Sequence, residues 1–388
     1  MEDLIYVITP VFPADRQLSF DDIFDGISLK QMEPRGKLGD TRCRTVKALS
    51  PANPCWKNLS RYIQIIKDFN ARHEDLFAVA DRHELYHSFK IPKRNGKLRP
   101  IDAPLEPLMD ALREMKMIFE QNFYAKHLYH TSSFAYVGNR CPRKLAERHT
   151  ANNSNWYGKL DDSQFFNNHT FDYVVRMMSK VFPFAMIVSD PEGKAAFEKM
   201  LDLCFLDGGL PQGTPMSPML TNICCIPIDF ALSRFAQNYT VNGEHHPLVY
   251  TRYADDKQFS CVYGFNVRDI EAAVERIYAD FDSPLRLNKE KTKYGSKAGR
   301  NWMLGVMINK DNKITVGFKR KAALKNLIYR FMSNSEQFDL QDVQHILGEI
   351  EYCKSIEPDR INEILAQYSS KFNTDVRSAI IERIKKGA

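Results

Sequence analysis

Two adjacent acidic residues, Asp255 and Asp256, stand inside a run of apolar and aromatic residues that extends from position 248 to 263. Flanking residues such as Tyr253 and Phe259 favour β-structure. The pattern predicts two strands joined by a tight turn. Asp is common in turns because its side chain bonds nearby backbone, but adjacent carboxylates repel each other. An isolated Asp-Asp pair is more often a solvated turn than a metal site, whereas a divalent cation such as Mg²⁺ would remove the repulsion.

The length and composition exclude several classes of protein. At 388 residues the chain exceeds one minimal domain, and a hydrophobic share of 44% fills a large core. No apolar run approaches twenty residues, and the first six residues carry no basic region, so neither a transmembrane helix nor a secretory signal is expected. The eight cysteines show no C-x-x-C spacing, which suits a reducing cytosol. We therefore expect a cytoplasmic protein without a membrane partner.

The net charge of +6 is distributed unevenly along the chain. Residues 289–330 contain twelve Lys or Arg against two acidic residues, so this stretch carries +10 and the rest of the chain −4. One basic region on a mildly acidic body is typical of proteins that bind polyanions. A solvated charged face explains the charge alone equally well.

Residues 1–85 are expected to form a helical N-terminal extension. Ser19 resembles a helix cap, and apolar residues recur at helical spacing from Tyr62 to Phe69. The segment around residues 36–54 is irregular in pattern. The following segment, residues 89–101, contains Asn95-Gly96 between two short β-like runs, which is a strong hairpin signal. This hairpin carries four basic residues that suit contacts with a triphosphate, Lys93, Arg94, Lys97 and Arg99.

A second candidate carboxylate ends a predicted strand. Residues 156–161 have strand character and finish on Asp161, which is placed to supply a third oxygen ligand beside the Asp-Asp turn. Asp162 is expected to point the other way and to be solvated or to cap a helix. Phe165 and Phe166 follow, and at least one of them is expected to pack in the core.

A turn-rich loop over residues 208–218 runs into a helix expected over residues 217–235. Its glycines let the backbone approach a ligand closely, and Gln212 offers both a donor and an acceptor to a base, sugar or phosphate. After the central hairpin the pattern predicts a helix, a short strand over residues 303–308, and C-terminal helices whose apolar face lies opposite Lys321 and Lys325. A basic stripe on such helices suits binding of a duplex through its phosphates.

Taken in order, these features resemble the reverse transcriptase family over residues 86–330. They run as a basic hairpin, Asp161 with Phe-Phe, Gly-Leu-Pro-Gln-Gly-Thr-Pro-Met-Ser-Pro, Tyr-Ala-Asp-Asp, Asn-Lys-Glu-Lys-Thr, Leu-Gly and basic helices. The resemblance implies an α+β, right-hand polymerase fold. Residues 86–310 would form fingers and a palm whose antiparallel sheet carries the Tyr-Ala-Asp-Asp hairpin, and residues 311–388 a helical thumb.

The resemblance also implies the active site. Asp161, Asp255 and Asp256 match the catalytic carboxylates around two Mg²⁺ or Mn²⁺ ions. Phe166 matches the residue whose bulk excludes a ribose 2′-hydroxyl. The other residues that match nucleotide-binding positions are Lys93, Arg99, Gln212 and Lys291. Leu304-Gly305 matches the primer-grip turn, and the basic helix adds nucleic-acid contacts from Lys319, Arg320, Lys321 and Lys325.

Within the family the chain is most similar to bacterial retron, group II intron and defence-associated enzymes. Leu145-Ala-Glu-Arg-His149 resembles the Asn-Ala-x-x-His segment of retron enzymes, although His149 by itself is expected to be structural. Retron enzymes usually carry Val-Thr-Gly where this chain has Met303-Leu304-Gly305, which argues against that type. Diversity-generating enzymes usually have Ser-Gln where this chain has Ser217-Pro218, and this difference disfavours that type. The sequence shows no zinc-ligand cluster, endonuclease segment or ribonuclease H domain, which a mobile intron enzyme would normally need.

The expected function is that of an RNA-directed DNA polymerase that adds deoxynucleotides to a DNA or RNA primer on an RNA template, in a stand-alone bacterial setting such as antiphage defence. A dedicated non-coding RNA, a partner or effector protein and homo-oligomers are compatible with it. Template-independent or protein-primed DNA synthesis by the same site stays open. So do ribonucleotide polymerisation, which the bulk of Phe166 disfavours, and a non-catalytic nucleic-acid-binding scaffold.

Overall fold

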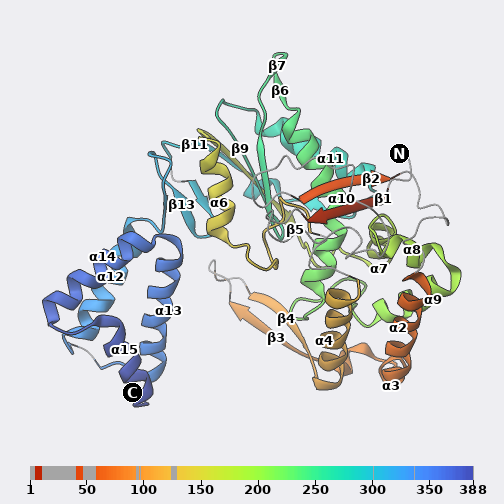
Figure 1. Ribbon diagram of the computed structural model, residues 1–388, viewed down its shortest axis with the longest axis horizontal. Helices are drawn as coiled ribbons and strands as arrows, with labels where there is room; N and C mark the ends of the chain where they lie inside the picture. Colours follow the sequence, from red (N-terminus) through yellow and green to blue (C-terminus); the bar gives the residue numbers. More distant parts are fainter. Residues whose placement is uncertain are drawn as a thin grey trace. The chain divides into compact units, whose positions relative to one another are not determined.

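The computed structural model describes residues 5–10, 41–46, 58–92, 96, 98–123, 129–299, 301–335 and 337–387 (Figure 1). The chain forms two compact units. The first comprises Met1–Arg140, Lys159–Phe259 and Asn266–Lys293, and the second comprises Cys141–Gly158, Ser260–Phe265 and Tyr294–Ala388. The cap expected at Ser19 lies outside the described residues. The N-terminal extension also contains an antiparallel pair of strands, β1 (Ile5–Pro10) and β2 (Thr41–Val46).

A five-stranded sheet carries the features singled out in the sequence. Four of its strands run in the order β10-β5-β9-β8, and a fifth, β11, also pairs with β5. β5 and β9 each contain residues that are assigned to both units. The strands are β5 (Trp156–Ser163), β8 (Val249–Tyr253), β9 (Asp256–Cys261), β10 (Arg286–Leu287) and β11 (Lys293–Ser296).

The longest helix of the first unit, α10 (Ser217–Gln237), is buried along most of its length because it packs against β8, α7 and α11. It is the one helix in the described part of the chain that is long and apolar enough to cross a membrane. Buried core helices share this composition, and 72% of its most apolar window is buried inside the protein. The other helices of this unit are α2 (Leu59–Arg72), α3 (Glu74–Phe77), η2 (Arg82–Leu85), α4 (Glu106–Gln121), α7 (Phe171–Met178), α8 (Phe184–Ser189), α9 (Pro191–Asp202), α11 (Val267–Asp280) and η3 (Lys289–Lys291).

The first unit contains two further hairpins, and the first of them forms where the sequence predicts it. β3 (Tyr86–Pro92) pairs antiparallel with β4 (Leu98–Pro104), and Gly96 lies between them with φ of 80°. β6 (Thr240–Val241) and β7 (Glu244–His245) are joined by Asn242-Gly243, both with positive φ. Asn and Gly tolerate this left-handed backbone at little steric cost, which is why the dipeptide identifies such turns from sequence.

The second unit contains a small sheet and a helical bundle. The sheet has the order β12-β13-β14, and α6 packs against β13 and β14. In the bundle, α13 packs against α12, α14 and α15. The elements are α6 (Pro142–Ala151), β12 (Asn301–Met303), β13 (Val306–Ile308), β14 (Ile314–Thr315), α12 (Phe318–Met332), α13 (Leu340–Ile356), α14 (Pro358–Phe372) and α15 (Val376–Lys385).

Candidate active site

The Asp-Asp pair lies at the tight turn that its sequence predicts. β8 ends at Tyr253 and β9 begins at Asp256, so Ala254 and Asp255 form the connection. Ala254 has φ of 53°, in the left-handed region that alanine rarely adopts. The turn therefore holds an unfavourable backbone conformation directly before Asp255, and surrounding contacts must maintain it.

Asp161 joins this turn because β5 lies beside β9 in the sheet. The backbone amide of Asp162 donates to the carbonyl of Asp255 at 3.2 Å, which ties the end of β5 to the turn. Asp161 itself is buried. The sheet thus gathers Asp161, Asp255 and Asp256, as the sequence predicts, although the first lies almost one hundred residues from the others.

Burial and neighbouring carboxylates disfavour the charged forms of Asp255 and Asp256. Burial, together with the charges of Asp256 and Asp161, raises the pKa of Asp255 to about 6. Burial also raises the pKa of Asp256, and Asp161 adds to this effect while Lys159 opposes it. Carboxylates whose charged forms are disfavoured by burial and mutual repulsion are stabilised by a cation bound between them.

Two lysines contact the carboxylates. The Nζ atom of Lys159 lies 2.8 Å from Oδ1 of Asp256 and donates a hydrogen bond to Oδ2 at 2.9 Å. The Nζ atom of Lys291 donates to Oδ1 of Asp161 at 2.6 Å, and this hydrogen bond raises the pKa of Lys291. Lys291 was predicted to lie at the site, whereas Lys159 was missed. Its position two residues before Asp161 on one strand was the available signal, because alternate residues of a strand share a face.

The prediction that Asp162 is solvated or caps a helix is wrong. Asp162 is buried, pairs with the buried ammonium group of Lys257, and accepts a hydrogen bond from the hydroxyl of Tyr278 at 2.8 Å. Asp161 and Asp256 face one side of the sheet, so Asp162 and Lys257, the next residues, face the other. The prediction that Asp161 and Asp162 point to opposite faces of the strand agrees with these contacts. The second face is not exposed to solvent, because the helix α11 covers it and supplies Tyr278.

The donor set fits a hard divalent cation such as Mg²⁺, which prefers carboxylate oxygens. Within the described residues no three His, Cys, Asp or Glu side chains are already grouped as a metal site. Lys159 and Lys291 instead neutralise two of the three carboxylates. A cation that bound here would take over the neutralisation that these ammonium groups provide.

Phe166 and Gln212 both stay partly exposed in the first unit. Phe165 is buried and Phe166 half-buried, with their rings edge to face at a centroid distance of 5.5 Å, so the one expected to pack in the core is Phe165. The carbonyl of Gln212 accepts from the amide of Asp102 on β4 at 2.9 Å. A Cβ atom on Gly213 would approach the carbonyl of Asp102 to 2.9 Å, so glycine permits this close contact between the loop and β4.

On the hairpin, Arg99 is exposed on β4 opposite Ile91 on β3. Lys93, Arg94 and Lys97 lie outside the described residues. Their predicted contacts with a triphosphate stay predictions.

Comparison with known protein families identifies the family of the chain that carries these carboxylates. The family model described as reverse transcriptase (RNA-dependent DNA polymerase) matches residues 91–317, more than half of the chain. The chain belongs to the reverse transcriptase family. The matched span contains all three carboxylates, Phe166, Gln212 and Lys291.

This reverse transcriptase is similar to curated retron proteins. It is 26% identical to the retron Ec83 reverse transcriptase of Escherichia coli, over 73% of this chain and 86% of that protein. It is also 26% identical to the retron Mx65 reverse transcriptase of Myxococcus xanthus, over 76% of this chain and 66% of that protein. The similarity exists despite Met303-Leu304-Gly305, which we took as evidence against the retron type. Among solved structures, apo telomerase from Candida tropicalis gives a TM-score of 0.42 at 14% identity, over 80% of this chain and 63% of that chain.

In the second unit of this reverse transcriptase, Leu304 and Gly305 form the turn between β12 and β13, where a single strand over residues 303–308 was expected. Both have positive φ, 55° and 85°. The hydroxyl of Tyr352 on α13 lies against this turn and donates to the carbonyl of Gly305 at 3.4 Å. The φ of 85° favours glycine at this position, and a Cβ atom there would also approach that hydroxyl to 2.8 Å.

The four cations predicted on α12 differ in their surroundings. Arg320 donates two hydrogen bonds to Glu349 and stacks on Tyr352, and Lys321 pairs with Glu357. Lys319 is exposed and Lys325 half-buried, and within the described residues neither forms an ion pair. No carboxylate in the described part of the chain therefore neutralises Lys319 or Lys325, whereas Arg320 and Lys321 join helices within the unit.

Proposed function

We propose that the chain is an RNA-directed DNA polymerase of retron-like bacterial type that extends a primer 3′ end with deoxynucleotides. The observation that carries the proposal is the convergence of Asp161, Asp255 and Asp256 on adjacent strands of one sheet. These residues lie in a segment that matches the reverse transcriptase family.

The proposal includes a right-hand arrangement. Residues 86–310 act as fingers and palm, residues 311–388 as the thumb, and residues 1–85 as an N-terminal extension. The five-stranded sheet supplies the palm, the β3–β4 hairpin supplies the fingers, and α12–α15 supply the thumb.

The carboxylates have distinct roles in this proposal. Asp161 and Asp255 would hold two Mg²⁺ or Mn²⁺ ions, and Asp256 would act more indirectly because Lys159 neutralises it. When bound, the ions lower the pKa of the primer hydroxyl and stabilise the leaving pyrophosphate. Lys291, which pairs with Asp161, would contact the phosphates of the incoming nucleotide.

The remaining site residues select and orient the nucleotide. The half-buried ring of Phe166 excludes a ribose 2′-hydroxyl. Gln212 contacts the nucleotide from a loop that is hydrogen-bonded to β4, and Lys93 and Arg99 hold the triphosphate from the hairpin. In the thumb, the turn at Leu304-Gly305 contacts the primer, and Lys319 and Lys325, with Arg320 and Lys321 beside them, contact duplex phosphates.

The proposal includes copying of a dedicated non-coding RNA, which the similarity to retron reverse transcriptases supports. The defence role is the broadest part of the proposal. A plaque assay that compares cells with and without the gene tests this role. A wild-type gene that protects against no phage would refute it.

The decisive experiment is to purify the protein with its bound nucleic acid, add Mg²⁺ and deoxynucleotides, and sequence the product. The Asp255→Ala/Asp256→Ala protein is the control. A defined cDNA copied from one RNA supports the proposal. Untemplated sequence, or DNA joined covalently to a Tyr or Ser, would replace it with untemplated or protein-primed synthesis. Full biological activity of the Asp255→Ala/Asp256→Ala protein would favour a scaffold.

A further inference from the structure

A buried ion pair lies behind the catalytic turn. Arg252, on β8, and Asp229, on α10, are both almost completely buried. The guanidinium donates from Nε and Nη2 to the two oxygens of Asp229, each at 2.8 Å. The phenol of Tyr250 donates to Oδ1 of the same carboxylate at 2.8 Å. Removing two charges from water is costly, and well-packed apolar side chains often stabilise a core equally well. The pair therefore calls for an explanation other than stability.

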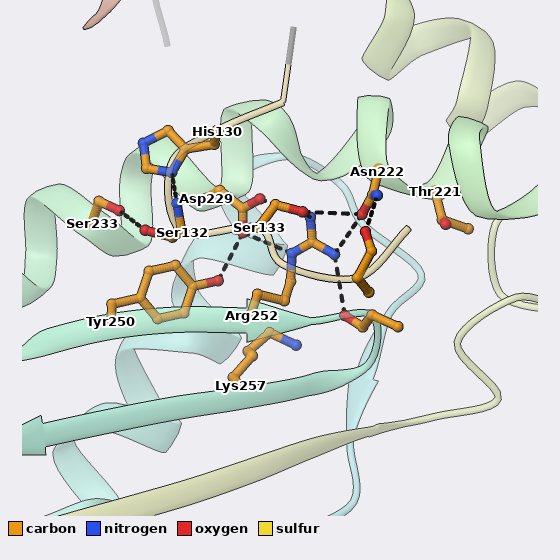
Figure 2. Close-up of polar contacts among 12 residues, drawn as sticks. His130, Ser132, Ser133, Thr221, Asn222, Asp229, Ser233, Tyr250, Arg252 and Lys257 are labelled. Carbon is orange, nitrogen blue, oxygen red and sulfur yellow. Dashed lines mark hydrogen bonds and ion pairs between the residues drawn. The ribbon is translucent and has the colours of Figure 1, made fainter. Parts of the chain in front are cut away.

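The remaining donors of Arg252 reach three separate segments, namely the turn, α10 and an earlier loop (Figure 2). Nη1 donates to the backbone carbonyl of Ala254 at 3.2 Å and to Oδ1 of Asn222 at 3.1 Å. Nη2 also donates to Oγ of Ser133 at 3.1 Å. One rigid, planar group thus holds the left-handed residue before Asp255 and, at the same time, a loop more than one hundred residues earlier in the sequence.

That loop, residues 132–136, is fixed on both sides. The amide of Arg252 donates to the carbonyl of Ser132 at 2.6 Å, and the amide of Phe134 donates to the carbonyl of Arg252 at 2.8 Å. Asn222 accepts from Oγ of Ser133 and donates from Nδ2 to the carbonyl of Ala135 at 2.8 Å. Main-chain and side-chain bonds therefore attach the loop to β8 and α10 together.

The loop ends in an exposed aromatic residue. Phe134 and Ala135 are buried, whereas Tyr136 has φ of 58° and keeps 55% of its surface exposed. Partial burial, and next the charge of Asp255, raises the pKa of Tyr136.

We propose that Arg252 is a positioning residue that holds the Asp255 turn and the loop of residues 132–136 in one arrangement. The catalytic part of this proposal rests on the proposed function. The positioning part concerns the backbone of the turn and does not require that any reaction be known.

Two matched substitutions separate positioning from general stability. Ser133→Ala removes a hydroxyl that accepts from Arg252 and donates to Asn222. Tyr250→Phe removes a hydroxyl that bonds only the Asp229 side of the network, among the bonds described. Each variant loses one hydroxyl from the same buried network. A third variant, Arg252→Lys, keeps a charge for Asp229 but lacks the fork that reaches Ala254.

Hydrogen exchange of peptides that span residues 252–258 is measured without nucleotide or metal, and steady-state kinetics with a defined primer and template are measured in parallel. In Ser133→Ala the turn should exchange roughly five- to tenfold faster than in the wild type, and kcat should fall by a similar factor. Tyr250→Phe should leave both within about twofold while lowering the melting temperature as much as Ser133→Ala does. Arg252→Lys, if it folds, should exceed Ser133→Ala in both effects.

The outcomes are distinguishable. Equal exchange of the turn in Ser133→Ala and Tyr250→Phe overturns the positioning role, whatever the kinetics show. A second outcome combines faster exchange in Ser133→Ala with a wild-type protein that extends no primer on any template. That outcome leaves the positioning role intact and overturns the proposed function. Faster exchange with an unchanged kcat in an active enzyme overturns the catalytic consequence of the positioning.

Discussion

Lys159 and Asp256 form an ion pair on the face of the sheet that carries the candidate active site, with Nζ 2.8 Å from Oδ1. Lys159 lies two residues before Asp161 on β5, so one strand supplies both a carboxylate and the cation that neutralises a neighbouring carboxylate. Charge balance at this site is therefore built into the strand pairing.

Replacing Lys159 with Met should lower the melting temperature of the metal-free protein by a few degrees, on the order of 3 °C, because Asp256 loses its counter-charge. It should also enlarge the increase in melting temperature caused by Mg²⁺. Lys289→Met is a matched control, since Lys289 also pairs at 2.8 Å, with Glu275, but at the exposed surface. Equal responses of the two variants to Mg²⁺ would contradict the role of Lys159.

Replacing Asp255 with Asn should stabilise the metal-free protein at neutral pH. The pKa of Asp255 in the folded protein, about 6, exceeds its ordinary value of 3.8, so the folded state binds the proton more tightly. Stability is then present at low pH and is lost as the pH rises through 6. Asp255→Asn should recover on the order of 2 kcal/mol at pH 7.5 and should abolish polymerisation. Urea unfolding at pH 4.5 and 7.5 measures the first effect, and a variant as pH-dependent as the wild type would refute it.

Replacing Phe166 with Ala should weaken discrimination against ribonucleotides by roughly tenfold or more, because the half-buried ring no longer blocks the 2′-hydroxyl. The measurement is the ratio of kcat/KM for deoxynucleotides to that for ribonucleotides. Phe166→Tyr keeps the bulk and should keep the ratio. Unchanged discrimination in Phe166→Ala would show that another residue selects the sugar.

The cations of α12 should separate into two groups. Lys319→Gln with Lys325→Gln should weaken binding to an RNA–DNA duplex and reduce its dependence on log salt concentration by about 2, one for each lost phosphate contact, without changing the melting temperature. Arg320→Gln should mainly lower the melting temperature, because it breaks the pair with Glu349. Fluorescence anisotropy at several salt concentrations tests this, and an unchanged salt dependence of the double variant would count against it.

His149 should make the protein sensitive to acid. It is buried, contacts Oγ of Ser260 through Nδ1 at 2.6 Å, and burial lowers its pKa to about 3. The unfolded chain, with a histidine pKa of about 6.5, therefore takes up the proton first, and stability falls as the pH drops from 6.5 towards 3. This contribution should be about 2 kcal/mol smaller at pH 5 than at pH 7.

His149→Gln should lose this part of the pH dependence, although it is less stable than the wild type at pH 7. His345→Gln changes an exposed histidine of the same unit and should keep the wild-type pH dependence. Urea unfolding of the three proteins at pH 5 and 7 gives the comparison. Parallel curves for all of them would show that His149 is not responsible.

Local patterns were sufficient to predict much of the molecule. The Asn-Gly turns, the turn at Asp255 and the helix that begins at Ser217 follow from backbone preferences and from the spacing of apolar residues, which act over a few positions. The three candidate carboxylates were predicted because their spacing in the chain matches a family pattern, which indicates proximity without geometry.

Long-range contacts decided the rest. The sequence by itself placed Asp161 and Asp162 on opposite faces of a strand, but only the packing of α11 made the second face a buried one and paired Asp162 with Lys257. Likewise, nothing near Arg252 in the sequence indicates that its fork reaches Ser133, Asn222 and Ala254 together. Burial and pairing depend on which elements meet in space, and short-range residue patterns do not encode that choice.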